Sequence, residues 1–220
     1  MRTVKGFGDR REAGKLLARQ LAPYANRDDV VVLALPRGGV PVGYEIALAL
    51  NAPLDVLAVR KLGVPGHEEL AMGAIASGGA YSLDNELIHH LGLRPEEMLK
   101  VIEDEQRELR RRESAYRDHR EFPDVTDKVV ILVDDGLATG QSMGVALTAL
   151  KALDPKKVII AAPVVTLDAC AELGRGAEIA YLLMPEPFFA VGIWYEDFGQ
   201  ISDDEVRDLL ARAAARGPKA

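Results

Sequence analysis

Short runs of β-branched and other apolar residues alternate with amphipathic stretches along this chain, and that alternation limits the fold more than any other feature. Helices are expected near 40–50 and 141–153, between such runs. Continuous apolar strands separated by helices are typical of a parallel sheet covered on both faces. The sequence therefore predicts an α/β fold whose strands lie at 30–35 (VVVLAL), 54–59 (LDVLAV), 128–133 (KVVILV) and 157–162 (KVIIAA).

Two segments interrupt the alternation. Residues 62–83 are rich in glycine and are expected to form a loop leading into a hairpin. Pro95, in the favoured first turn, then opens a long charged helix to about Arg120. Its stretch RELRRRESAYRDHR fits a solvated face with ion pairs, or an arm that meets a partner subunit or an anionic ligand. The apolar positions of this helix form one narrow stripe: Met98, Ile102, Leu109 and Tyr116.

Composition narrows the class of protein. The chain has 220 residues, 48% hydrophobic and 28% charged, as expected for a globular protein with one main core. A net charge of −7 argues against a general nucleic-acid binder, since nothing in bulk neutralises phosphates. Cys170 is the single cysteine, so no intramolecular disulfide forms. With no signal-peptide pattern and only short apolar runs, a cytoplasmic protein without membrane contact is expected.

Charged residues and glycines cluster where the expected strands end. In an open α/β sheet, ligands bind outside the carboxyl ends of the strands. Arg37, Gly38 and Gly39 follow the first strand, and paired glycines allow a close backbone approach to an anion. Arg60 and Lys61 are expected to end the second strand, where a purely structural strand needs no cations.

The third strand ends in two adjacent carboxylates, Asp134 and Asp135. Such a pair can accept hydrogen bonds from a vicinal diol or hold hydrated Mg²⁺. Residues 138–142 (ATGQS) then open a helix, where hydroxyls, free amides and the helix dipole suit a phosphate. A diol binder beside a phosphate cradle indicates a ribose 5-phosphate ligand. A simple helix cap would not explain both carboxylates and two glycines.

Competing motifs fail on composition or order. No Gly-Lys-Ser/Thr follows Gly136, so a Walker A loop is excluded. GQSMG matches the G-x-S-x-G nucleophile elbow, but all four histidines precede Ser142, against the hydrolase order. The histidines also lack the spacing of a zinc site.

The stretch VVILVDDGLATGQS resembles the PRPP-binding signature of type I phosphoribosyltransferases. In the same order, LPRGGVPVG is similar to the first pyrophosphate loop of this family and VRK to its basic strand end. Residues 63–76 lie where the family has its mobile catalytic loop, and FFAVGIWYEDF (188–198) is similar to its base-stacking hood. The resemblance spans about 30–200, and the chain looks most like the predicted phosphoribosyltransferases of bacteria and archaea.

The resemblance implies a Rossmann-like parallel sheet in a single domain, 1–220, with a helical and hairpin insertion at about 62–120 and a hood at about 184–200. It also implies a role for each matching residue. PRPP would be bound by Arg37, Gly38, Gly39, Arg60, Lys61, Asp134, Asp135, Ala138, Thr139, Gly140, Gln141 and Ser142. Asp134, Asp135 and Lys61 would be catalytic, and the two aspartates would also hold Mg²⁺. Phe188, Phe189 and Asp197 would contact the base.

Two departures from the family pattern leave an alternative open. Gly136 replaces the usual β-branched residue after the acidic pair, and Ala138 replaces the aspartate proposed as general base in 6-oxopurine enzymes. The expected activity is Mg²⁺-dependent transfer of ribose 5-phosphate from PRPP to a nitrogenous, purine-like acceptor. The alternative is a non-catalytic PRPP- or nucleotide-binding regulatory module. A homodimer is expected, with residues 110–117 at the subunit contact and Arg111 or Arg112 as candidates to act in trans.

Overall fold

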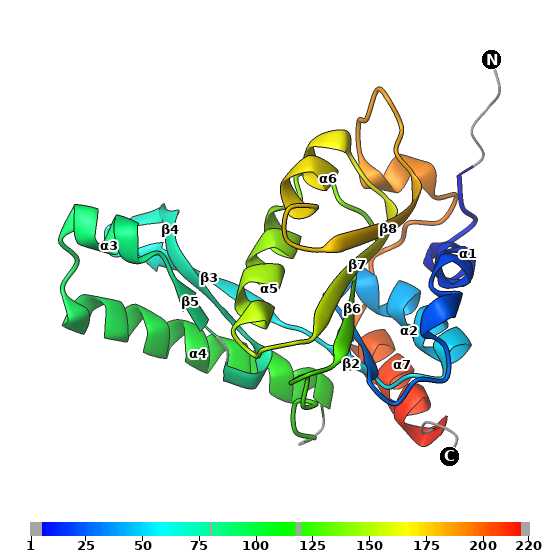
Figure 1. Cartoon of the computed structure of the whole chain (residues 1–220), viewed down its shortest axis with the longest axis horizontal. Helices are drawn as coiled ribbons and strands as arrows, with labels where there is room; N and C mark the ends of the chain where they lie inside the picture. The colour runs from blue at the N-terminus through cyan, green and yellow to red at the C-terminus, as the bar shows by residue number, and fades with distance from the viewer. Residues whose placement is uncertain (1–5, 80, 118–119, 217–220) are drawn as a thin grey trace.

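The structure, a computed structural model, describes residues 6–79, 81–117 and 120–216. Its centre is a five-stranded parallel sheet in the order β2-β1-β6-β7-β8 (Figure 1). Val31 pairs with Val130, and Val130 with Val158, so the most apolar strands lie in the middle. The predicted α/β class is confirmed. The strands are β1 (Val30–Ala34), β2 (Leu54–Val56), β6 (Val129–Val133), β7 (Lys157–Val164) and β8 (Glu178–Leu183).

Helices cover both faces of this sheet, because its strands carry apolar side chains on both faces. On one face lie α1 (Arg10–Gln20), α2 (Gly39–Leu50) and α7 (Asp203–Arg216); on the other lie α5 (Gln141–Lys151) and α6 (Leu167–Leu173) (Figure 1). Alternate residues of β6 serve the two cores. Ile131 and Val133 pack with α2 and α7, whereas Val130 and Leu132 pack with α5. Short 3-10 turns lie at Ala22–Tyr24, Ser77–Gly79 and Val191–Trp194.

The expected second strand, 54–59, is wrong in its extent. β2 ends at Val56, and the chain then leaves the parallel sheet. The amide of Leu57 still donates to Ala34, but that of Ala58 donates to the hydroxyl of Ser77, outside this sheet. A new strand, β3 (Val59–Val64), begins at once, so Arg60 and Lys61 lie inside it and do not end β2.

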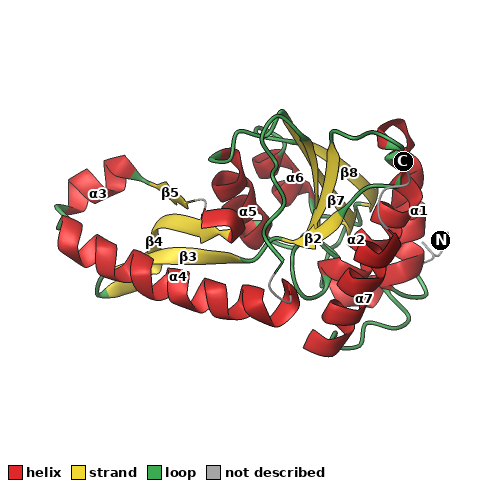
Figure 2. Ribbon diagram, turned by 90° about the horizontal axis from the view of Figure 1, so that it is seen from below, coloured by secondary structure: helices red, strands yellow, loops and turns green. Residues whose placement is uncertain are grey.

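Residues 62–83 are likewise not a loop before a hairpin. β3 and β4 (His67–Ala76) form the hairpin themselves, and β5 (Tyr81–Leu83) adds a third antiparallel strand. The glycines admit close neighbours: a methyl group on Gly73 would lie 2.2 Å from the Ser82 carbonyl. With α3 (Asn85–Leu91) and α4 (Pro95–Arg117), this small sheet makes an arm that projects from the body (Figures 1 and 2).

The charged helix α4 connects the arm to the body (Figure 2). Its predicted stripe is confirmed: Leu109 is buried against the arm sheet, and Tyr116 lies in the main core. The solvated ion pairs are also found, for example Arg107 with Asp104 and Arg111 with Glu108. Within the described residues this helix runs from Pro95 to Arg117.

Arg117 differs from the solvated charged residues of α4, because its side chain is buried and the residue is only 4% exposed. Its Nε lies 2.9 Å from Asp55 of β2, and its Nη1 lies 2.6 Å from Glu113. Since Tyr116 and Arg117 are buried within their own chain, only the exposed part of 110–117 is free to meet another subunit. The side chain of Arg112 and all of His119 lie outside the described residues. No helix in the described ranges is long and apolar enough to cross a membrane.

Candidate functional site

Two aspartates follow the carboxyl end of β6, at the edge of the sheet where ligands bind. Continuing the alternation of β6, Asp135 lies on the side of α1 and α2 and Asp134 on the side of α5. The amide of Asp134 still donates to Ala161 of β7, and that of Asp135 donates to Asp134 Oδ1 at 2.9 Å. The sheet thus fixes the two neighbouring carboxylates in different directions.

Asp135 is bound by an arginine from the other end of the chain. Arg10 Nε lies 2.7 Å from Asp135 Oδ2, and Arg10 Nη1 donates to the Gly199 carbonyl at 2.8 Å. The guanidinium carbon lies 3.8 Å from the centre of the Phe198 ring. Arg10 is the first residue of α1, whose start is fixed by Asp9: its carboxylate accepts the Glu12 amide.

The glycines after β1 lie directly against the acidic pair. A methyl group on Gly38 would lie 2.1 Å from Asp135 Oδ2, and one on Gly39 would lie 2.6 Å from the Val133 carbonyl. The amide of Leu35 donates to that same carbonyl, so β1 and β6 remain paired up to this point. Because Gly38 and Gly39 lack side chains, the predicted pyrophosphate loop can lie directly against the predicted acidic pair.

The environment of the two carboxylates raises their pKa values. Burial raises the pKa of Asp134 to about 8, and the charge of Asp135 adds to the shift. Burial also raises the pKa of Asp135, while the hydrogen bond from Arg10 acts against that shift. Carboxylates whose charge is disfavoured in this way are typical of sites that bind a cation or a charged ligand.

The predicted phosphate cradle lies at the start of α5. Gly140, with φ 72°, forms the N-cap, and the Gln141 amide lies 3.4 Å from Thr139 Oγ1. Thr139, Gln141 and Ser142 are exposed. Thr166 holds the loop from below by donating its hydroxyl to the Ala138 carbonyl at 2.7 Å. An eleven-residue helix thus offers its amino end and three polar side chains to solvent.

The three predicted cations lie in different surroundings. Arg37 Nη1 lies 3.9 Å from Asp203, at the start of α7. Arg60 Nε lies 2.5 Å from Glu105 of α4, so it links the arm sheet to its helix. Lys61 is exposed and donates to the Glu69 carbonyl across the β3–β4 hairpin. Arg37 therefore belongs to the loop beside the acidic pair, whereas Arg60 and Lys61 belong to the arm.

The predicted hood, 184–200, packs against the acidic loop and the amino-terminal segment. Phe7 donates its amide to the Trp194 carbonyl, and Glu196 donates back to Phe7. A methyl group on Gly136 would lie 2.4 Å from Val191 Cγ1, which explains glycine where the family has a β-branched residue. Of the proposed base contacts, Phe188 is partly buried, and Phe189 (77%) and Asp197 are exposed.

Neither Arg10 nor Tyr195 is among the predicted site residues, but both are buried beside the acidic loop. Tyr195 donates its hydroxyl to the Asp135 carbonyl at 2.6 Å. The Asp9–Glu12 cap pattern could have marked the start of a helix, but no local pattern joins residues 125 positions apart.

The donor set suits magnesium. Among residues 6–79, 81–117 and 120–216, no three His, Cys, Asp or Glu side chains are grouped to hold a metal. Mg²⁺ usually binds one or two carboxylates and takes its remaining ligands from phosphates and water. The pair Asp134 and Asp135 fits that mode and would not make an all-protein cage.

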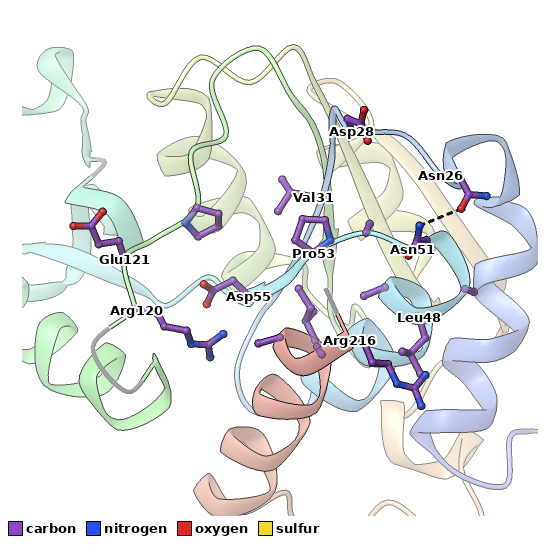
Figure 3. Close-up of a pocket in the computed structure, with 17 residues that line it drawn as sticks. Asn26, Asp28, Val31, Leu48, Asn51, Pro53, Asp55, Arg120, Glu121 and Arg216 are labelled. Atoms are coloured by element: carbon purple, nitrogen blue, oxygen red, sulfur yellow. Dashed lines mark hydrogen bonds between the residues drawn. The ribbon is translucent and has the colours of Figure 1, made fainter. Parts of the chain in front are cut away.

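A cavity of about 1020 Å³ lies at the opposite edge of the sheet (Figure 3). Asn26, Asn51 and Pro53, which precede β1 and β2, line one side, and Arg120 and Arg216 line the other. Because the strands are parallel, their amino ends lie far from the carboxyl edge that carries the acidic pair. This cavity is therefore separate from the candidate site.

Comparison with known proteins gives consistent results. A family model described as a phosphoribosyl transferase domain matches residues 10–176. Two Mycobacterium tuberculosis proteins provisionally named phosphoribosyl transferases, from strains CDC 1551 and H37Rv, are 43% identical over 211 residues. The match covers 96% of this chain and 47% of each relative, so the chain spans about half the length of these curated relatives.

Solved structures share the fold. The crystal structure of TT1426 from Thermus thermophilus is 40% identical with a TM-score of 0.84, covering 94% of this chain and 98% of that one. The AQ2163 protein from Aquifex aeolicus, 15% identical with a TM-score of 0.50, covers 91% of this chain and 84% of that one. The acidic strand end, the glycine loop and the family match agree: the chain belongs to the phosphoribosyl transferase domain family, a family of transferases.

Proposed function

We propose that this protein transfers the ribose 5-phosphate of PRPP to a nitrogenous acceptor and releases pyrophosphate, with Mg²⁺ as cofactor. One observation carries the proposal: three groups meet at the carboxyl ends of the strands. Gly38 and Gly39 lie against Asp134 and Asp135, and the exposed amino end of α5 follows in the chain. Diol, pyrophosphate and 5-phosphate each have a matching group there. Family membership supports this reading.

In this proposal the protein acts by positioning and electrostatics. The amino end of α5, with Thr139 and Ser142, binds the 5-phosphate, and the amides after β1 receive the pyrophosphate. An acidic pair near the anomeric carbon stabilises positive charge as the bond to pyrophosphate breaks. Asp134 and Asp135 would hold Mg²⁺, which would supply positive charge for the pyrophosphate leaving group. Arg37 and Lys61 supply further positive charge.

The acceptor is proposed to be a purine-like base that meets the hood. Phe189 exposes an aromatic ring, and Phe188 lies partly buried beside it. An exposed ring can stack on a flat base, with a centroid separation of about 4.5–7 Å. Asp197 accepts the Gly199 amide at 2.9 Å, which leaves its second oxygen for the base edge or a second metal ion.

A non-catalytic PRPP- or nucleotide-binding module is the second candidate. It is favoured by Ala138, which is exposed at the phosphate loop where 6-oxopurine enzymes place an acidic residue. Without that residue, proton removal from the acceptor has no assigned base. Such a module would keep the binding site and lose turnover.

The organisation proposed for the protein is a single domain over 1–220, with an insertion at about 62–120 and a hood at about 184–200. We propose a cytoplasmic homodimer whose contact includes the exposed residues Arg110, Arg111 and Ser114 of α4. A monomeric mass at micromolar concentration would contradict the dimer.

Pyrophosphate release from PRPP and Mg²⁺ tests the function across purine, pyrimidine and other nitrogenous acceptors. Release with one acceptor, abolished in the Asp134→Asn, Asp135→Asn double variant, is the expected result. If nothing reacts, calorimetry with PRPP on the same sample separates the candidates. Binding without turnover favours the regulatory module, and the absence of binding contradicts both.

A further inference from the structure

We propose that Arg10 is a positioning residue that holds Asp135 against α1 and the hood, so that Asp134, which has no arginine partner among the described contacts, is the aspartate that binds the sugar. The inference rests on the proposed PRPP site. It assigns different roles to two aspartates that the sequence pattern does not distinguish. It adds to the site a residue from the start of the chain, outside the signature.

Arg10 makes three contacts with three separate parts of the chain. Its Nε lies 2.7 Å from Asp135 Oδ2, its Nη1 donates to Gly199, and its guanidinium stacks on Phe198. Arg10 is 8% exposed. A buried guanidinium with a carboxylate, a carbonyl and an aromatic face as partners has little freedom to move. Arg10 therefore ties α1, the acidic loop and the hood into one unit.

The carboxylate of Asp135 is enclosed from a second side. Gly38 lies so close that a methyl group there would reach within 2.1 Å of Oδ2, the oxygen that Arg10 binds. A sugar hydroxyl approaching that oxygen would have to displace a charge-assisted hydrogen bond. Asp134 has no arginine at hydrogen-bond distance among the described contacts, and it follows β6 on the side of α5, where the phosphate cradle lies.

Charge supports the same division. PRPP is a polyanion, and an uncompensated Asp135 carboxylate beside its sugar would repel it. The Arg10 guanidinium offsets the negative charge of Asp135, which leaves the Asp134 carboxyl group for the diol and the metal ion. Arg10 acts on the sugar site through Asp135. Among its described contacts there is none with a residue proposed to bind phosphate.

The neighbouring residue provides a control for charge. Arg11 lies on the same helix and binds Glu45 at 2.6 Å, but its side chain is 48% exposed, against 10% for Arg10. Arg11→Gln therefore tests whether losing any one positive charge from α1 weakens PRPP binding, and thermal melts separate that effect from a loss of stability in Arg10→Gln.

Calorimetric titration with PRPP and Mg²⁺ tests the inference, because it needs no known acceptor. We expect Arg10→Gln and Asp135→Asn each to weaken PRPP binding about tenfold, and Asp134→Asn about a hundredfold. The Arg10→Gln, Asp135→Asn double variant is expected to bind within about twofold of the weaker single variant. Arg10→Lys keeps the charge but loses the second hydrogen bond and the stacked guanidinium, so it should bind PRPP more tightly than Arg10→Gln and more weakly than wild type. Arg11→Gln should bind within about twofold of wild type.

Independent, multiplying effects of Arg10→Gln and Asp135→Asn would overturn the inference, as would an equal loss in Arg11→Gln. An Asp134→Asn variant that binds no worse than Asp135→Asn would also overturn it. A thermal melt of each variant accompanies its titration. If Arg10→Gln does not fold, the test uses Arg10→Lys in its place: PRPP binding by Arg10→Lys and by Asp135→Asn is compared with binding by Asp134→Asn. A wild-type protein that does not bind PRPP refutes the proposed function itself, before any variant is compared.

Discussion

The hydroxyl of Tyr195 donates a hydrogen bond of 2.6 Å to the backbone carbonyl of Asp135, 60 residues earlier in the chain. The ring of Tyr195 is buried between Phe7 and Phe198. Burial raises the pKa of this phenol, so it remains a protonated donor over the physiological range. Tyr195 thus anchors the hood directly to the acidic loop.

Tyr195→Phe is expected to lower stability and weaken PRPP binding, because a buried carbonyl loses its partner and the loop its anchor. The stability cost should be about 1–3 kcal/mol, or about 2–4 °C of melting temperature for each kcal/mol. Scanning calorimetry and PRPP titration measure the two effects. Tyr181→Phe, at an exposed position on β8, is the control; equal melting temperatures for the two variants would contradict the prediction.

Gly38→Ala should abolish PRPP binding with a smaller effect on folding. Its methyl group would lie 2.1 Å from Asp135 Oδ2, so either the loop or the carboxylate must move. Gly144→Ala in α5 is the matched control, since its methyl group meets only Leu173 at 3.7 Å. That variant should bind PRPP normally and gain about 0.5–1 kcal/mol from helix propensity. Titration of both variants with PRPP checks the contrast, and normal binding by Gly38→Ala would refute it.

The elements predictable from sequence are those with a local signal. β1, β6 and β7 are continuous apolar runs, and the glycines and aspartates after β1 and β6 meet because parallel strands end at one edge. The break after Val56 had no such signal. Leu57 and Ala58 are as apolar as the strand before them, and the chain joins a second sheet because β3 pairs with the distant strand β4, starting beside Ser77.

The contacts of Asp135 show the same limit at the site. The residue type and its place after β6 predict a functional carboxylate, but its partners Arg10 and Tyr195 come from either end of the chain. Such pairs depend on how α1 and the hood pack over the sheet. Arg117 in α4 is another case, because its sequence surroundings match those of its solvated neighbours and only packing against β2 buries it.

Arg117→Met should destabilise the protein by about 3–5 kcal/mol, because it leaves the buried carboxylate of Asp55 without its charge partner. Arg117 also donates to the Val56 carbonyl and lies 4.9 Å from the Phe122 ring, so the loss affects β2 and the arm together. Arg111→Met removes an exposed pair on the same helix and should leave the unfolding midpoint almost unchanged. Denaturant unfolding of both variants tests this, and similar midpoints would show that the buried pair contributes little.

Asp134 should make the stability of the ligand-free protein depend on pH. Burial raises its pKa from 3.8 to about 8, so the folded state holds a proton that the unfolded state releases near pH 4. The stability that this proton provides is complete below about pH 4 and is lost as pH rises to about 8. Asp134→Asn mimics the protonated form and should match wild type at pH 4 to 5 but melt a few degrees higher near pH 8.

Asp29 provides the opposite case for the same experiment. The hydrogen bond from Arg27 lowers its pKa to about 2, so its contribution is present above about pH 4 and is lost as pH falls towards 2. Asp29→Asn should therefore change only the acid side of the melting curve, and Asp134→Asn only the side between pH 4 and 8. Melting temperatures measured across this range decide: an Asp134→Asn variant with the same slope as wild type above pH 5 would show that this carboxylate is already charged in the ligand-free site.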